Sequence, residues 1–266
     1  MAFEHDTPFL ESLRIQARVI GALLMREIVT RYGRDNLGFL WLFVEPMMFT
    51  LGVTGIWAGA GLRHSASLPI VAFAVSGYSS VLLWRNCAIR CSMAIPPNMP
   101  LLFHRNVRVL DLLVTRILLE VAGATMSFFV LSVLWVSLGW MEPPADLLKI
   151  LIGWGLLIWF GGSLALVVGG GTAHSEIVER IWHPVSYLLF PLSGAAFMVD
   201  WMPTRFQEIV LWIPMVHATE MLRDGFFGSA VRTHYDPQYM ALCCALLTLA
   251  GLLLVEEAGR RIEVQT

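Results

Sequence analysis

The sequence has little charge and almost no lysine. Only 14% of its 266 residues are Asp, Glu, Lys or Arg, whereas about 25% is usual for a soluble domain, and 57% are hydrophobic. A soluble protein needs charged side chains to hydrate its surface, so this composition excludes a soluble globular domain and predicts a membrane protein. The eighteen basic and twenty acidic residues leave a net charge of −2, which gives no electrostatic bias toward nucleic acid.

The chain also lacks the motifs of ATP hydrolysis and of common hydrolases. Its one lysine, Lys149, lies between Leu148 and Ile150 and cannot belong to a Gly-Lys-Ser/Thr phosphate-binding loop. No histidine and glutamate have the HExxH order, and no Gly-x-Ser-x-Gly elbow occurs. The four cysteines show no CxxC spacing, so we expect neither a metal site nor a disulfide framework. We predict a chain that is not an enzyme and holds no cofactor; any ATP and Mg²⁺ would be bound by a partner ATPase.

Six apolar segments are long enough to cross a bilayer, which takes about 20 residues per helix. With a cytoplasmic N-terminus, thirteen of the eighteen basic residues lie on the inner side and five lie outside: Arg63, Lys149, Arg205, Arg223 and Arg232. This asymmetry is typical of a protein with both termini in the cytoplasm. An alternative in which 203–232 also crosses would place Arg260 and Arg261 outside. The predicted spans of this single transmembrane domain are about 36–59, 69–90, 115–139, 147–172, 181–199 and 237–255.

Residues 9–31 precede the first span and are too charged to cross the membrane. Apolar residues recur at three- and four-residue steps from Leu10 to Ile28, while Glu11 falls on another face. This pattern predicts an amphipathic helix in the membrane interface. Its basic residues and those just after it either anchor the helix or help to admit an anionic lipid head group; they are Arg14, Arg18, Arg31 and Arg34.

The longest cytoplasmic connection contains a short apolar segment, residues 94–106, which we call the coupling segment. Its prolines end the preceding helix and favour the start of another. Its apolar bulk either docks into a groove of a partner or folds back onto the membrane interface. The residues expected to make the contact are Asn98, Met99, Pro100, Leu101, Leu102, Phe103, His104 and Arg105.

Residues 200–232, which we call the outer hairpin, lie outside but are too apolar for an ordinary loop. Pro203 can open a short helix through Trp212, and 215–227 can form a second helix after Pro214. Two short apolar helices broken by proline indicate a re-entrant hairpin covered by protein or by a water-filled cavity. Its returning helix carries His217, Glu220 and Arg223 near the outer mouth, and Arg223 can pair with Glu220 or with Asp224.

Charged groups within the spans are candidates for function. Glu45, before Pro46, either faces a cavity or has a structural role beside the proline kink or a neighbouring arginine. Arg116 and Glu120 are expected to form a structural ion pair. The aromatic residues near the expected path are Trp41, Phe49, Tyr78 and Phe197, although packing and interfacial belts explain such residues as well. Seven glycines in the fourth span favour close helix packing.

The order of these features resembles the membrane permeases of ABC exporters that move capsular and related polysaccharides out of Gram-negative bacteria. Residues 31–46, Arg-Tyr-Gly-Arg-Asp-Asn-Leu-Gly-Phe-Leu-Trp-Leu-Phe-Val-Glu-Pro, resemble the family's junction of interface helix and first span. Residues 98–111 resemble its coupling segment. Ser193, Gly194 and Phe197 with Pro203, Pro214, His217, Glu220 and Arg223 resemble its fifth span and hairpin. Ile213 departs from the family's asparagine before proline.

The resemblance implies an all-α inner-membrane permease subunit with six transmembrane helices, an interfacial helix, a coupling helix and a re-entrant hairpin. It implies a homodimer that carries two separate ATPase subunits. Residues 98–105 would sit in the ATPase groove, with Ser175 and Glu176 in a second contact. A lipid-linked acidic polysaccharide would pass between the two subunits, and a periplasmic or outer-membrane partner could contact the hairpin.

Two alternatives remain open from the sequence. The first keeps an ABC permease but changes the cargo to an O-antigen, a teichoic-acid-like polymer, a lipid or a drug. The second is a stand-alone secondary transporter, which would be expected to show inverted internal repeats. The two halves of this chain have different loop patterns, and this difference disfavours the second alternative.

Overall fold

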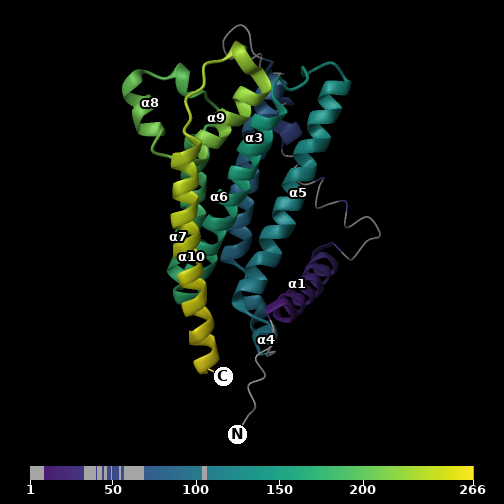
Figure 1. Cartoon of the computed structure of the whole chain (residues 1–266), viewed down its shortest axis with the longest axis vertical. Helices are drawn as coiled ribbons and strands as arrows, with labels where there is room; N and C mark the ends of the chain where they lie inside the picture. The colour runs from purple at the N-terminus through teal and green to yellow at the C-terminus, as the bar shows by residue number, and fades with distance from the viewer. Residues whose placement is uncertain are drawn as a thin grey trace.

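The regular elements that the structure describes are helices that run side by side. The computed structural model describes residues 9–32, 69–103 and 107–265, with individual residues between 40 and 56. In these ranges the long helices follow one axis (Figure 1): α3 (Ile70–Ser92), α5 (Val109–Ser137), α6 (Leu147–His174), α7 (Glu176–Leu192) and α10 (Pro237–Gln265). The prediction of an all-helical chain is therefore confirmed over these residues. Several predicted site residues lie outside them: Arg34, Trp41, Glu45, Phe49, His104 and Arg105.

Three of these helices are long and apolar enough to cross a membrane. They are α5, α6 and the part of α10 that ends at Ile262. They coincide with three of the predicted spans, 115–139, 147–172 and 237–255. Helices α3 and α7 lie alongside them in the same direction, where two further spans were expected.

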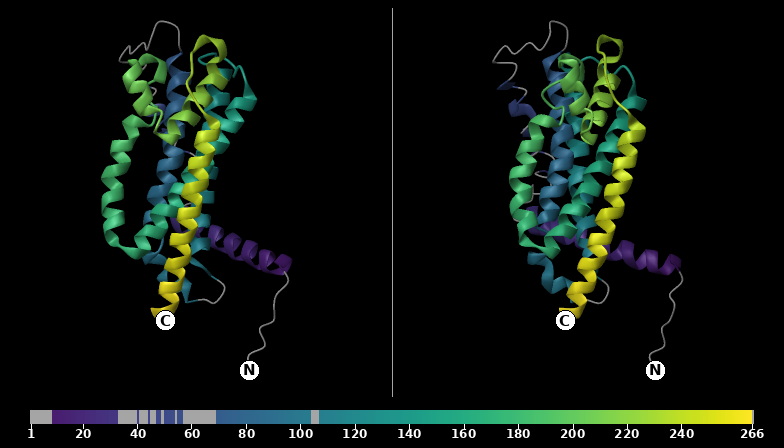
Figure 2. Two further views of the ribbon diagram at one scale, coloured as in Figure 1. Left: turned by 60° about the vertical axis from the view of Figure 1, so that its left-hand side comes forward. Right: turned by 90° about the vertical axis from the view of Figure 1, so that its left-hand side faces the viewer.

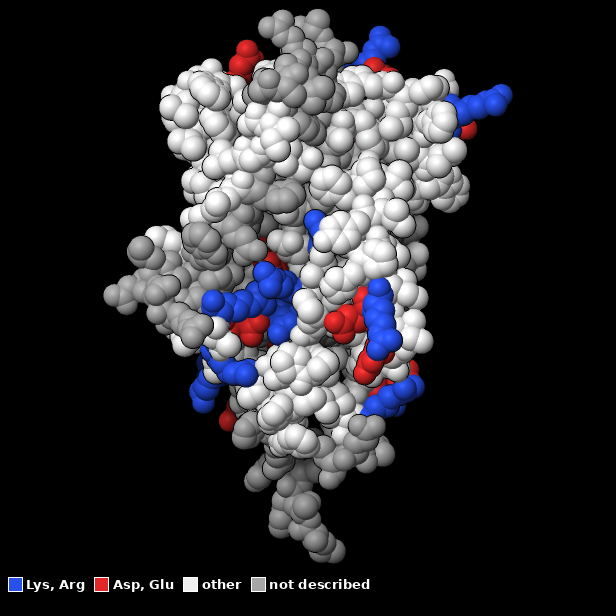
Figure 3. Space-filling view, turned by 180° about the vertical axis from the view of Figure 1, so that it is seen from behind, with Lys and Arg blue, Asp and Glu red and all other residues white. Residues whose placement is uncertain are grey.

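The surface of the bundle separates charged from apolar regions. In Figure 3 the charged side chains gather in the lower part and at the upper edge, with an almost uncharged zone between them. Outward-facing apolar residues include Phe129 on α5 and Leu246 and Leu249 on α10, each about 60% exposed. A soluble protein would not leave so many large apolar side chains in water, whereas lipid tails accept them.

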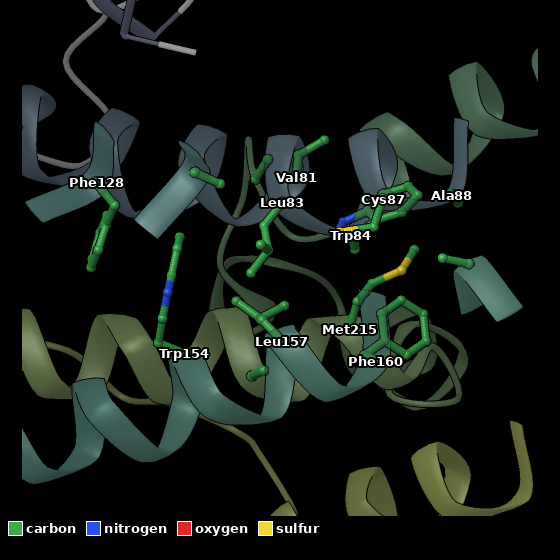
Figure 4. Close-up of a cluster of buried hydrophobic side chains, with 14 of the residues drawn as sticks. Val81, Leu83, Trp84, Cys87, Ala88, Phe128, Trp154, Leu157, Phe160 and Met215 are labelled. Atoms are coloured by element: carbon green, nitrogen blue, oxygen red, sulfur yellow. The ribbon is translucent and has the colours of Figure 1, made fainter. Parts of the chain in front are cut away.

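Helix α6 lies at the centre of the bundle, between α3 on one side and α10 on the other. Figure 4 shows Leu157 and Phe160 of α6 facing Leu83 and Trp84 of α3. Phe128 of α5 stacks on Trp154 with ring centres 4.3 Å apart. Glycine permits this approach: a Cβ added to Gly161 would lie 2.9 Å from the Trp84 Cα, and one added to Gly251 would lie 2.6 Å from the Leu166 Cβ. The predicted packing role of the α6 glycines is thus supported at Gly161.

The two ends of the bundle differ. Helix α1 (Phe9–Tyr32) projects across the bundle axis near the end that holds α4 (Met99–Leu102) and the last turn of α10 (Figure 2). The opposite end holds α8 (Thr204–Val210) and α9 (Pro214–Phe227), as expected for the outer hairpin. Short 3-10 turns, Pro96–Asn98, Val199–Trp201 and Gly228–Ala230, join these elements.

The fifth predicted span, 181–199, was placed too far along the chain. Helix α7 begins at Glu176, where the Ser175 hydroxyl accepts a hydrogen bond from the Ile177 amide at 3.2 Å. It ends at Leu192 because Gly194 adopts a left-handed conformation, with φ of 80°. Phe197 is therefore in the irregular segment after α7 and not in a helix. The last helix reaches Gln265, beyond the predicted end at 255.

The contact between Gly161 and Trp84 can be tested by adding one methyl group. Gly161→Ala should destabilise the protein by about 1–3 kcal/mol, because the new Cβ meets the α3 backbone. Gly155→Ala on the same helix is the control: nothing lies within 4 Å of its Cβ position, so the better helix former should stabilise it by up to about 1 kcal/mol. Thermal unfolding of both purified variants measures the difference, and equal melting temperatures would contradict the close packing.

Candidate functional site

The coupling segment presents a narrow exposed face. The backbone turns at Pro96–Asn98 and forms α4 over Met99–Leu102. Pro97, Pro100 and Phe103 are exposed at three-residue spacing, and Phe103 has 65% of its surface accessible. Asn98 is buried, and Leu102 packs against the hydrophobic core. Among the described residues of the segment, the exposed surface includes Pro97, Pro100 and Phe103 with Pro96 beside them, and Leu102 supports it from behind.

Helix α1 holds the coupling segment on both of its sides. The Arg26 guanidinium donates to the Asn98 side-chain oxygen at 2.8 Å, just before α4. The Asn98 amide in turn donates to the Ala94 carbonyl at 2.8 Å. After the segment, the Gln16 amide donates to the Asp111 carboxylate, which also accepts from the Arg108 backbone at 2.8 Å. The contacts from Arg26 and Gln16 join residues far apart in the chain, and no sequence pattern marks them.

A network of ion pairs fastens α1 to α3 and α5; we call these residues the charge cluster. Arg31 lies 2.7 Å from Glu120 and 2.7 Å from Glu27, and Arg116 lies 3.3 Å from Glu27. Arg90 of α3 lies 3.5 Å from Glu120. The predicted ion pair between Arg116 and Glu120 is therefore wrong: Arg116 pairs with Glu27 of α1, and Glu120 pairs with Arg31 of α1 and Arg90 of α3.

Of the arginines predicted to meet a lipid head group, the described ones differ in accessibility. Arg14 and Arg18 are exposed, whereas Arg31 is partly buried in the charge cluster. Burial acts to lower the pKa of Arg31, but Glu120 and Glu27 outweigh it and raise that pKa above its ordinary value. Arg31 therefore stays charged and paired with Glu27 and Glu120. Of these described arginines, Arg14 and Arg18 are exposed and accessible to an external anion.

The turn between α6 and α7 lies at the same end as α4 (Figure 2). Ser175 caps α7, as described above, and Glu176 is exposed with its carboxylate 3.1 Å from Arg180. Of the two residues predicted for a second partner contact, Glu176 is exposed and Ser175 is half-buried, and both lie at the end of the bundle that holds α4.

The outer hairpin is built around a buried ion pair. Glu220 and Arg223 have no exposed surface, and their charged atoms are 4.0 Å apart. The Glu220 carboxylate accepts from the backbone amides of Val199 and His234, both at 3.2 Å. Of the two partners that the sequence left open for Arg223, the structure has Glu220, and Asp224 pairs with Lys149 at 2.7 Å.

Arg223, the basic member of this ion pair, contacts α3. The Arg223 guanidinium donates to the carbonyls of Phe197 and Ala195. It also lies 3.8 Å from the ring centre of Phe73 on α3. Arg223 therefore fastens the irregular segment after α7 to the outer end of α3.

His217 joins two other parts of the hairpin. Its Nδ1 accepts from the Asp236 amide at 2.9 Å, so the Nε2–H donates to the Leu211 carbonyl at 2.8 Å. Burial lowers the pKa of His217, which favours this neutral tautomer. His217, Glu220 and Arg223 thus bind backbone in this conformation, and this favours a structural role for all three.

Two aromatic residues of the expected path are also described. Tyr78 of α3 is nearly buried, and its ring centre lies 5.5 Å from that of Phe190 on α7. Phe197 is half-buried in the segment that Arg223 holds. Across the residues that the structure describes, no three His, Cys, Asp or Glu side chains are grouped so that they could hold a metal ion.

The buried pair can be tested by removing one charge without changing the size of the side chain. Glu220→Gln leaves the Arg223 charge uncompensated and replaces one acceptor oxygen by an NH₂ group, so it should destabilise the protein by at least about 2 kcal/mol. Glu208→Gln, an exposed position on α8, is the matched control. Thermal unfolding and the amount of protein in the membrane measure the effect; an unchanged melting temperature would contradict the structural role of Glu220.

Known proteins resemble the chain along its whole length. The capsule polysaccharide export inner-membrane protein CtrC of Neisseria meningitidis serogroup B is 46% identical over 98% of both chains. The capsule polysaccharide export inner-membrane protein BexB of Haemophilus influenzae is 42% identical over the full length of both. The polysialic acid transport protein KpsM of Escherichia coli is 26% identical over 90% of this chain and 93% of its own. Residues 18–227 match the ABC-2 type transporter family, and the chain therefore belongs to that family.

Proposed function

We propose that this chain is the permease subunit of an ATP-driven exporter that carries capsular polysaccharide across the inner membrane. The observation that carries the proposal is the full-length similarity to inner-membrane proteins of capsule export, at 41–46% identity. A membrane component of the ABC-2 type has no nucleotide-binding domain, so a separate ATPase subunit would bind ATP and Mg²⁺.

The proposed arrangement is a homodimer of six-span subunits with both termini in the cytoplasm. The clustering of α1, α4, the charge cluster and the end of α10 at one end of the bundle supports a cytoplasmic position for that end. The first span, 36–59, would complete the six. The outer hairpin would then face the periplasm, where an export partner could meet it.

Movement would begin at α4. The ATPase subunit would bind the exposed face of Pro97, Pro100 and Phe103, with Ser175 and Glu176 in a second contact. When the ATPase subunits close on ATP, α4 would be displaced. The Arg26–Asn98 and Gln16–Asp111 contacts would carry this displacement to α1 and α5.

The cargo would be a lipid-linked acidic polysaccharide that passes between the two subunits. Arg14, Arg18, Arg31 and Arg34 would form the basic entrance for its anionic head group, and Arg14 and Arg18 are the exposed members among the described residues. Trp41, Glu45, Phe49, Tyr78 and Phe197 would contact the polymer weakly at many points, so that no single site retains it. His217, Glu220 and Arg223 would hold the frame of the outer mouth.

A substitution on α4 tests the proposed contact with the ATPase. Phe103→Asp should abolish copurification of the ATPase subunit and glycan transport in proteoliposomes, because a carboxylate cannot enter an apolar groove without loss of hydration. Phe206→Asp on α8 is the matched control: Phe206 is 59% exposed at the opposite end of the bundle. Leu102 is unsuitable because it packs against the core.

The outcome separates the proposal from its alternatives. Copurification of the ATPase with Phe103→Asp at the wild-type level would exclude docking through α4. Transport of a lipid or drug but not of a glycan by the wild-type complex would exclude the proposed cargo and keep the ABC permease.

The contact between Arg26 of α1 and Asn98 can be tested separately from ATPase binding. Arg26→Gln removes the charged donor to Asn98 but leaves the exposed face of α4 intact, so the ATPase should still bind and hydrolyse ATP. Transport per ATP should fall severalfold, since displacement of α4 no longer reaches α1. Arg261→Gln, an exposed arginine paired with Glu257 on α10, is the control; equal transport per ATP in both variants would contradict this path of coupling.

A further inference from the structure

Arg85 is a basic residue inside the bundle that has no acidic partner. It lies on α3, seven residues before the helix ends at Ser92, which is about 10 Å along the axis. Its Nε is buried and has no hydrogen-bond acceptor. Nothing in the described part of the chain forms an ion pair with it, whereas Arg90 and Arg116 on the same side of the bundle have Glu120 and Glu27.

Among the described residues, Arg85 contacts the aromatic ring of Tyr187. Its guanidinium carbon lies 4.4 Å from the centre of the Tyr187 ring on α7. This stacking covers a flat face of the guanidinium and leaves its N–H edge available. The ring stabilises the cation less than a carboxylate would, so an arginine held in this way inside a membrane protein is a candidate for binding an anion.

The position of Tyr187 keeps the site accessible from outside the subunit. Tyr187 is 64% exposed and the adjacent Leu188 is 68% exposed. The described residues therefore leave the Tyr187 side of this pair open. A group that moves along the outer side of α3 and α7 can reach the guanidinium edge.

We propose that Arg85, stacked on Tyr187, binds an oxyanion group of the cargo, a phosphate or a carboxylate, as it passes along α3 and α7. The proposal rests on the proposed function. Arginine suits this task because its planar fork donates two parallel hydrogen bonds to such a group. An anion of this kind supplies the acceptors that Arg85 lacks.

The site continues a route that begins at the charge cluster. Arg90 lies five residues nearer the end of α3, or about 8 Å along the helix. Each arginine of the cluster lies within 3.5 Å of Glu27 or Glu120, although three arginines share two carboxylates. Among the described residues beyond the cluster along α3, Arg85 is the next cation that a negative group would meet, and it has no acidic neighbour.

The oxyanion has two possible sources, the phosphate of a lipid anchor and the acidic groups of the glycan, and two binding assays distinguish them. The first measures by native mass spectrometry how much phosphatidylglycerol, compared with phosphatidylcholine, the purified complex retains. The second measures binding of a fluorescent sialic acid oligomer, with a neutral glucose oligomer as reference. Arg85→Gln should weaken at least one of these interactions roughly tenfold, as expected for a charge-assisted hydrogen-bond pair.

Matched variants distinguish the contributions of the Arg85 charge, the planar shape of its guanidinium and the stacking on Tyr187 to anion binding. Arg85→Lys should recover only part of the binding, because it keeps the charge and loses the fork. Tyr187→Phe should behave as the wild type and Tyr187→Leu should not, since only the ring is required. Arg260→Gln, an exposed arginine on α10, removes the same charge elsewhere and should change neither interaction.

The results distinguish a failure of the Arg85 site from a failure of the proposed function. Loss of phosphatidylglycerol in Arg85→Gln identifies the lipid phosphate as the source, and loss of the sialic acid oligomer identifies the glycan. Unchanged binding of both probes by Arg85→Gln overturns the site, even if wild-type export is normal. If the wild-type complex exports no glycan, the proposed function fails, and the two binding assays alone decide the site.

Discussion

A charge inside a membrane protein must be compensated close by, because lipid and packed side chains solvate it poorly. This constraint organises both ends of the bundle. At one end, Glu27 and Glu120 hold arginines from three helices together. At the other, Glu220 and backbone carbonyls hold Arg223. The helices between these ends are apolar and join through close packing around α6, so the charged contacts fix the relative positions of their ends.

The two charged ends differ in what they connect. The cluster near α4 joins α1, α3 and α5 through side chains that are partly accessible, and helices tied in this way can shift relative to one another. The outer pair is fully enclosed and binds three backbone segments. Movement is therefore easier at the α4 end, which is the end that we propose contacts the ATPase.

The sequence predicted the helices better than the contacts between them. Apolar length alone located α5, α6 and α10, and the prolines located α4 and the hairpin. The fifth span was misplaced because its end depends on the left-handed conformation of Gly194. A glycine within an apolar run does not by itself indicate that a helix ends there. The sequence also limited the partners of Arg223 to Glu220 and Asp224, because residues three apart on a helix share a face, but it did not choose between them.

The parts of the site that the sequence could not predict are the contacts over long distances in the chain. Nothing in the sequence near Arg26 indicates its contact with Asn98. Glu27 reaches Arg116 because α1 crosses the bundle beside α5. Burial also changed the role that we assign to residues of the outer hairpin. His217, Glu220 and Arg223 were expected near an open mouth, but their bonds to backbone favour a fixed frame. Exposure similarly narrowed the predicted contact: Phe103 stays exposed, whereas Leu102 packs against the core.

Helix α3 connects the two ends. It leads at one end into the coupling segment, while at its other end the Phe73 ring lies against Arg223. Because α3 also packs tightly on α6 at Gly161, it cannot slide independently of the centre of the bundle. A displacement of α4 would therefore reach the hairpin by rotation of α3 and α6 together rather than by bending of one helix. Arg85 lies on this same helix, so such a rotation would also change how its guanidinium faces the anion that we propose it binds, and cargo binding would be coupled to the movement that we propose the ATPase drives.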